Sequence, residues 1–518
     1  MKRLTFSITL AGLALFATSC GGGGSNVGPP PPPPITGGFS NASLNGHYAF
    51  SMSGNDSNGF FARIGSITAN GQGLITEGVE DINDSVGVAR IIFTGGTYSI
   101  GGDGRGSLQL VNSTGTTHYS ISLGSTSKGY IIETDTFATA GGSLAKQDTT
   151  AFLFQGNALA PGIAGGYVFD VSGIDNGGVP ESIVGRFTAD GAGNVSGGVM
   201  DENLSGSVPS GAMRFASASY GVDSVNTVDL PSFGRGVFNL ASNTFVFYIV
   251  DGTRVFFLGT NVPAVLSGEA DAQQSMTFDN TSLIQNQSYA YSIGGAGPPS
   301  SGMFGPIAAA GRFTADGSGN LRAITLDEND SGGLTQVTNE SGAYSVDTSG
   351  LSAGSGRGTA TFNNSTGMFT FVFYLMSPTQ AVFQETDSGI VSDGVFQAQA
   401  PGPFTASSLA GDYAFRWNAV DTNGEDDFVG RLTLTSAGVP SGGVDFNESG
   451  QVFLSYPFNG TLALAPDSTG ANTFSITTTP SPTNTLNFTL YIVNPTQSFV
   501  VGTDPQIVAG GVMSGQQH

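Results

Sequence analysis

The chain repeats one pattern four times, and this repetition constrains its fold more than any other feature of the sequence. Each copy opens with a short run led by a tyrosine, and the four lead tyrosines are 119, 122 and 124 residues apart: Tyr48, Tyr167, Tyr289 and Tyr413. Large apolar residues alternate along each run, which is the period of a β-strand with one buried face. One domain of roughly 110 residues is therefore expected four times over.

Other landmarks recur at matched places in the copies. Three copies carry an Asn-Gly or Asp-Gly pair typical of hairpin tips: Asn70-Gly71, Asp190-Gly191 and Asp316-Gly317. Three copies carry a Gly-Arg-Gly triplet around Arg105, Arg235 and Arg357, and all four close with a glutamine: Gln147, Gln273, Gln399 and Gln516. Counting alternating runs gives about eight strands per copy. Beyond the leader, no stretch of ten or more residues shows helical periodicity. The fold class is therefore predicted to be all-β.

The copies are expected as four tandem antiparallel β domains at residues 41–150, 160–275, 281–400 and 405–517. Short strands joined by tight turns favour eight-stranded up-and-down barrels, with β-sandwiches as the alternative. The opening Gly46-His47-Tyr48 resembles the Gly-x-Trp start of calycin-like barrels such as lipocalins and avidins, with Tyr in place of Trp. That resemblance implies a closed barrel that can hold one small ligand. Residues 405–517 are predicted to fold alone.

Residues 1–20 have the layout of an export signal, with Lys2 and Arg3, an apolar core, and small residues before Cys20. The end of this leader resembles the lipobox of bacterial lipoproteins, which implies cleavage before Cys20 and a lipid anchor on its sulfur. A plain signal peptide with a free thiol is the alternative. Residues 21–40, rich in glycine and proline, are predicted to form a tether. The predicted location is exported and lipid-anchored, at the outer membrane or cell surface.

Charge and residue usage exclude several classes of function. The net charge of −23 would repel a nucleic-acid backbone, so no nucleic-acid partner is expected. The single cysteine excludes a disulfide within the chain, and three histidines leave little imidazole chemistry. No Gly-x-Ser-x-Gly elbow is present. We predict a non-enzyme without a resident cofactor, calcium excepted.

Acidic residues gather where the third strand of each copy is expected to end. Carboxylates in such runs suit Ca²⁺, and Asp81, Asp201 and Asp327 are the calcium candidates. The fourth copy has Asp445 and Glu448 there, and a second acidic run at residues 421–427. Solvated turns whose side chains cap their own backbone are the main alternative, and a catalytic carboxylate pair is a further one.

Two recurrent features indicate contacts beyond a single barrel. The arginines of the Gly-Arg-Gly triplets are predicted to form structural ion pairs, with an anionic ligand as the alternative. The sixth strands of copies 2 to 4 are apolar on both faces, whereas a small barrel buries only one face. The second face is expected to pack on a neighbouring copy, or to meet a ligand, a partner or lipid.

These observations predict a non-catalytic surface lipoprotein of repeated β domains with a role in adhesion or envelope structure. The alternative is a carrier that binds a small apolar or glycan ligand inside the β-barrels. The expected partners are the membrane, through the lipid anchor, and a surface or small-molecule ligand.

Overall fold

The computed structural model describes residues 38–518 except 153, 156–157, 160–162, 209–210, 216–217, 224–232, 241–242, 301–302, 364–366, 466–469 and 480–483. The predicted signal peptide, Cys20 and most of the predicted tether lie outside the described residues. Within them the chain is all-β and forms four eight-stranded antiparallel barrels, so the predicted fold class and the preference for barrels over sandwiches are confirmed. No helix in the part that the structure describes is long and apolar enough to cross a membrane.

The first barrel is a closed meander in which each strand pairs with the next and the last pairs with the first. A short 3₁₀ helix, η1 (Asn41–Ser43), precedes it. Its strands are β1 (Asn45–Asp56), β2 (Gly59–Asn70), β3 (Leu74–Asn83), β4 (Val88–Ile100), β5 (Arg105–Asn112), β6 (Thr116–Leu123), β7 (Lys128–Glu133) and β8 (Ala138–Lys146).

The second barrel follows the same course, and β12 pairs with β13 to complete its circuit. β14 and β15 lie on either side of residues 216–217, which are outside the described residues, and both pair with β13. Its strands are β11 (Ala164–Ile174), β12 (Pro180–Asp190), β13 (Asn194–Leu204), β14 (Met213–Phe215), β15 (Ala218–Val222), β16 (Arg235–Leu240), β17 (Asn243–Asp251), β18 (Arg254–Gly259) and β19 (Val265–Ala272). Between the first and second barrels lie η2 (Thr149–Phe152) and a separate two-stranded sheet of β9 (Phe154–Gln155) and β10 (Ala158–Leu159).

The third and fourth barrels are again closed meanders. The third contains η3 (Asn280–Ser282), β20 (Gln287–Ser300), β21 (Met303–Ala315), β22 (Asn320–Asp330), β23 (Gly333–Val346), β24 (Arg357–Asn363), β25 (Met368–Ser377), β26 (Gln380–Glu385) and β27 (Val391–Ala398). The fourth contains β28 (Gly411–Val420), β29 (Glu425–Leu434), β30 (Pro440–Glu448), β31 (Gln451–Ala463), β32 (Asn472–Thr478), β33 (Thr485–Asn494), β34 (Gln497–Gly502) and β35 (Val508–Gly515).

Each barrel is filled by the apolar side chains that alternate along its strands. The lead tyrosines are buried, and their hydroxyls donate to backbone carbonyls, as from Tyr167 to Gly252 at 2.6 Å. Glycine on the second strand lets the ring of the first-strand aromatic lie against the backbone. At Gly65 a Cβ atom would lie 2.5 Å from the Phe50 ring. The apolar spaces left inside the second and third barrels measure about 10 and 20 Å³, about the room of one water molecule.

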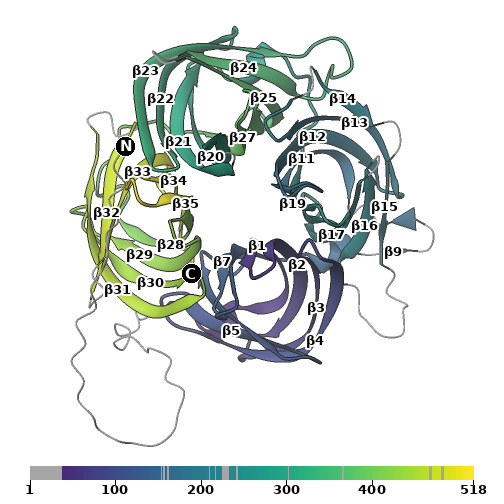
Figure 1. Ribbon diagram of the computed structural model, residues 1–518, viewed down its shortest axis with the longest axis vertical. Coiled ribbons are helices and arrows are strands. Elements are labelled where there is room, and N and C mark those ends of the chain that lie inside the picture. Colours follow the sequence, from purple (N-terminus) through teal and green to yellow (C-terminus); the bar gives the residue numbers. More distant parts are fainter. Residues whose placement is uncertain are drawn as a thin grey trace, which may run out of the picture.

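The four barrels are arranged in a closed ring (Figure 1). The first, second, third and fourth barrels follow one another around it, and the fourth lies beside the first. The first and last strands of each barrel face the centre of the ring, where β1, β19, β20 and β35 lie (Figure 1).

Candidate functional site

The contacts between barrels are built from the conspicuous repeated residues of the sequence. Asp81 on β3 of the first barrel accepts two hydrogen bonds from the guanidinium of Arg235 on β16, at 2.7 and 2.8 Å. It also accepts one from the hydroxyl of Tyr248 on β17, at 2.7 Å. Asp81 is 1% exposed, so this is a buried bidentate ion pair between two barrels.

The same set of residues recurs between the second and third barrels. Asp201 accepts from Arg357 at 2.7 and 2.8 Å and from the Tyr374 hydroxyl at 2.7 Å. Burial raises the pKa of Tyr374, and the Asp201 carboxylate raises it further, so the phenol remains a hydrogen-bond donor. The predicted structural ion pairs of Arg235 and Arg357 are therefore confirmed, and each joins two copies.

Between the third and fourth barrels the aspartate is kept but its partners change. Asp327 accepts from the Tyr491 hydroxyl at 2.5 Å and from the Gln336 amide. The fourth copy lacks the Gly-Arg-Gly triplet, which accounts for the missing guanidinium. Burial raises the pKa of Asp327, and these two hydrogen bonds oppose the rise.

The three calcium candidates therefore lie between barrels and are buried, so the expectation that they sit in solvated turns is wrong. Arginine, tyrosine or glutamine side chains bind the carboxylates of Asp81, Asp201 and Asp327. Calcium binding at these residues stays a prediction. In the structure these carboxylates accept hydrogen bonds from side chains of the neighbouring barrel.

A fully buried asparagine two residues after each aspartate repeats at all four seams of the ring. Its amide donates to backbone carbonyls of the next barrel: Asn83 to Gly259 and Ala264, Asn203 to Glu385 and Ile390, Asn329 to Gly502, Asp504 and Ile507, and Asn447 to Glu133, Asp135 and Ala138. The closing glutamines do the same: Gln147 to Phe233 and Ile249, Gln273 to Ser355 and Leu375, Gln399 to Ile492, and Gln516 to Asp103 and Leu123. The seam from the fourth barrel to the first therefore uses the same bonds as the others.

Apolar packing supports three of the four seams. Val246, Tyr248 and Val250 of β17 pack against Ala62 and Ile64 of the first barrel. Similar clusters join the second barrel to the third and the third to the fourth. The expectation that the second apolar face of the sixth strands packs on a neighbouring copy is thus confirmed.

The fourth seam, between the last barrel and the first, is polar. No apolar cluster among the described residues bridges these two barrels, because the sixth strand of the first copy carries Ser120 and Ser122 at the outward positions. The Ser122 hydroxyl donates to the carbonyl of Gly430 at 2.7 Å. Arg105 lies 3.9 Å from Asp445, a longer contact than the Arg235–Asp81 and Arg357–Asp201 pairs.

The centre of the ring holds a cavity of about 780 Å³ lined by all four barrels. Its wall is mixed, because serines and charged residues alternate with glycines and with apolar residues such as Met52, Phe60 and Phe256. The polar lining residues are Ser51, Ser53, Asn55, Ser143, Ser172, Glu181, Ser267, Glu269, Asp393 and Arg416.

Carboxyl groups cluster on the cavity wall between the second and third barrels. Burial raises the pKa of Asp393 to about 6, and hydrogen bonds from Ser182 and Ser172 oppose the rise. Burial, together with the nearby Glu202, raises the pKa of Glu181 to about 8. Near neutral pH this wall therefore offers both hydrogen-bond donors and acceptors.

Arg416 on β28 is the one cationic residue among the described lining residues. Its charge acts on Glu269 of the second barrel and on Glu425 of the fourth, but its guanidinium forms no hydrogen bond or ion pair with any described residue. Five N–H donors are therefore available to a group in the cavity.

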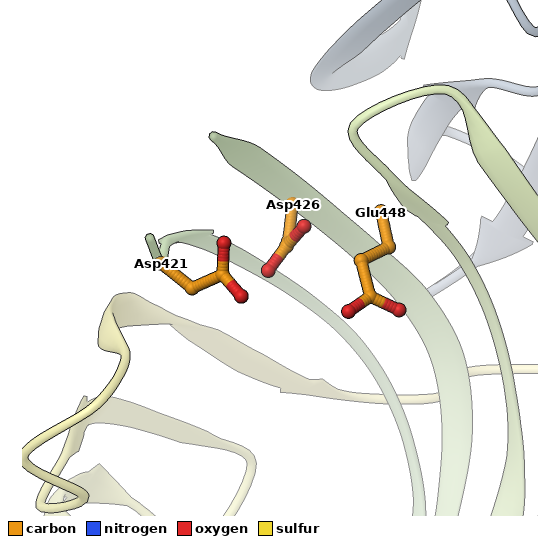
Figure 2. Close-up of side chains that lie close together, drawn as sticks. All are labelled: Asp421, Asp426 and Glu448. Carbon is orange, nitrogen blue, oxygen red and sulfur yellow. The ribbon is translucent and has the colours of Figure 1, made fainter. Parts of the chain in front are cut away.

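A further set of carboxylates meets in the fourth barrel. Asp421, Asp426 and Glu448 lie with oxygen atoms within 4.8 Å of one another, and their side chains converge (Figure 2). Both acidic runs of this copy are visible in the sequence. The calcium candidates of the other copies, however, occupy the position of Asp445, which faces a neighbouring barrel, and not the positions of these three residues. Inward and outward residues alternate along a strand, so a shift of one position separates a seam residue from a residue inside the barrel.

No known protein family matches the chain, and no curated protein matches it. Among solved structures, a transferrin-binding protein B double mutant from Haemophilus parasuis matches with 10% identity and a TM-score of 0.20, covering 76% of this chain and 83% of that one. The transferrin-binding protein B of Neisseria meningitidis matches with 9% identity and a TM-score of 0.18, covering 75% and 84%. The protein CghA, solved with Sch210972, matches with 12% identity and a TM-score of 0.17, covering 68% and 88%. Similarity at this level carries no conclusion about the function of this chain.

The cavity could not be found from the sequence. Its lining residues come from all four copies and form no sequence motif together, and ring closure alone brings them into one cavity. The closing glutamines were a visible signal for the seams, because they recur at the same place in every copy.

Proposed function

We propose that this protein is an exported, lipid-anchored binding protein that takes up a small, hydroxyl-rich polar ligand, such as a glycan, at the centre of its ring. The observation that carries the proposal is the guanidinium of Arg416, which lies in a cavity shared by four barrels and has no hydrogen-bond or ion-pair partner among the described residues. It would bind an acceptor group of the ligand, while the serines and carboxyl groups would bind hydroxyls.

This proposal places the ligand between the barrels rather than inside them. Spaces of about 10 and 20 Å³ in the second and third barrels are too small for an organic ligand. Cys20 and the tether at residues 21–40 are proposed to hold the ring at the outer membrane or cell surface.

A role in adhesion or envelope structure is the second candidate. The filled barrel interiors favour it, since tightly packed barrels joined in a ring suit a rigid structural element.

Native mass spectrometry of residues 21–518 tests the binding proposal, using neutral oligosaccharides, uronic-acid oligosaccharides and free amino acids as probes. We expect retained mass, or binding of a saccharide probe, that Arg416→Met weakens about tenfold or more, as loss of a charge-assisted hydrogen bond would do. Arg322→Met is the matched control, because Arg322 lies on the third barrel with a side chain that is 65% exposed. Binding unaffected by Arg416→Met, or absence of any binding, would contradict the cavity proposal and favour the structural role.

A further inference from the structure

Three carboxylates close one end of the fourth barrel. Asp421 follows β28, Asp426 lies on β29, and Glu448 ends β30, so the three come from adjacent strands. Asp426 is the cross-strand partner of both Ala419 and Glu448. Their oxygen atoms lie within 4.8 Å of one another (Figure 2).

Strand alternation turns the side chains of Asp426 and Glu448 toward the barrel interior. Phe428 and Phe446 each lie two residues further into the barrel, and both belong to its buried core. Side chains two residues apart on a strand share a face. The carboxylates are therefore placed over an aromatic core, where charge is poorly solvated.

Asp426 carries the second and independent observation. It is 2% exposed, and its Oδ1 atom has no hydrogen-bond partner among the described residues. No described cation pairs with it, whereas Asp421 accepts hydrogen bonds from the backbone of Asn423 and Gly424. Burial, together with the nearby charges of Asp421 and Glu448, raises the pKa of Asp426 to about 8. A buried carboxylate without a donor or a cation is costly and is normally compensated.

The other copies provide an internal comparison. The residue four positions before the second-strand glycine is Phe61 in the first copy, Glu181 in the second, Ile307 in the third and Asp426 in the fourth. The position of Glu448 is occupied by Asp84, Leu204 and Asp330 in the earlier copies. Only the fourth copy has a carboxylate at both of these positions, so the barrel architecture does not require the cluster.

We propose that Asp421, Asp426 and Glu448 bind one Ca²⁺ ion at this end of the fourth barrel. Carboxylate oxygens are the ligands that calcium prefers, and water would complete its shell. Two oxygens on opposite sides of Ca²⁺ stand about 4.6 to 5.2 Å apart, whereas those around Mg²⁺ stand about 4.0 to 4.2 Å apart. Oxygen atoms that all lie within 4.8 Å of one another can reach a single ion of this size.

The residues next to these ligands hold the polar seam of the ring. Glu425, adjacent to Asp426, accepts a hydrogen bond from Asn55 of the first barrel at 2.6 Å. Asn447, adjacent to Glu448, donates to three carbonyls of the first barrel. An ion that fixes the ends of β29 and β30 would therefore also strengthen the seam that lacks an apolar cluster.

Calcium titration of residues 21–518 tests this proposal, with isothermal calorimetry and thermal melts in CaCl₂, MgCl₂ or EDTA. We expect one Ca²⁺ per chain, a melting temperature several degrees higher in CaCl₂ than in EDTA, and a smaller shift in MgCl₂. Asp426→Asn should abolish the calcium shift and melt above the wild type in EDTA, because the cost of protonating or desolvating a buried acid is gone. Glu448→Gln serves as a second variant should Asp426→Asn fail to fold.

Asp84→Asn is the matched control. Asp84 occupies the position of Glu448 in the first barrel, but the position of Asp426 is held there by Phe61, so the cluster is incomplete. This variant should respond to calcium as the wild type does. Absence of heat and of a melting shift in the wild type would overturn the proposal. So would a calcium response that survives in both Asp426→Asn and Glu448→Gln.

Discussion

Single buried side chains decide where the copies touch and where charge is tolerated. Asp81 and Asp201 were recognised from the sequence as a repeated acidic position, and Arg235 and Arg357 as repeated cations. Their pairing across copies was missed, because alternation along a strand shows which residues point outward but not which barrel they meet. The aspartates are 1% and 3% exposed, so burial between barrels, rather than solvation, governs their chemistry.

Glu385 on β26 gives a pH dependence that can be measured. It is 6% exposed, and its Oε1 atom has no described hydrogen-bond partner, although Ser392 donates to Oε2 at 2.8 Å. Burial raises its pKa to about 8 from a model-compound value of 4.5. The unfolded chain therefore loses this proton first as the pH rises, and the free energy of unfolding falls between these two values and then levels off.

We expect Glu385→Gln to raise the free energy of unfolding by on the order of 2 kcal/mol at pH 8 and to leave it nearly unchanged at pH 4.5. Urea denaturation at both pH values measures this difference. Glu340→Gln, at a partly exposed position of the same barrel, controls for the general loss of one negative charge. An equal effect of Glu385→Gln at both pH values would contradict the expectation.

At the level of the elements, the eight strands of each copy followed from alternation and turns, and the closed barrel from the run of consecutive hairpins. The two-faced sixth strands correctly indicated neighbour packing. The polar outer face of β6 is equally readable and marks the one seam without an apolar cluster.

The structure changes the expectation for the fourth copy on its own. Tyr491, Val493, Phe499 and Val501 belong to the apolar cluster shared with the third barrel, and an isolated copy would expose them. We expect residues 401–518 to fold but to self-associate, because association would remove this exposed apolar face from water. Light scattering coupled to size-exclusion chromatography measures the mass. Tyr491→Ser with Val493→Ser should restore a monomer, whereas a monomeric wild-type fragment would contradict the assignment.

At the scale of the whole molecule, ring closure depends on a seam that combines hydrogen bonds with few apolar contacts. Asn447 and Asn329 are fully buried, and each donates to three carbonyls of the next barrel. Of these two seams, only the one that contains Asn329 also has an apolar cluster among the described residues. Asn447→Ala should therefore open the ring, and Asn329→Ala should leave it closed.

Small-angle X-ray scattering of residues 21–518 measures this difference. A compact chain of this length has a radius of gyration of roughly 23 Å, and an open chain of four barrels has a larger one. We expect only Asn447→Ala to increase the radius. Equal radii for the two variants would show that the apolar cluster does not distinguish the seams.

The seams also explain why the chain has four copies. Each barrel offers one face to the next copy and a different face to the previous one, and a head-to-tail contact of this kind makes either a ring or an endless filament. Here four seams complete the circle, so the fourth barrel contacts the first. Neither of these two barrels is left with an interface that has no partner. A fifth copy would have no place in the ring, and loss of one copy would leave two unmatched faces exposed. The number of repeats is thus set by the angle of a contact, and duplication or deletion of a copy would turn a closed monomer into a polymer-forming one.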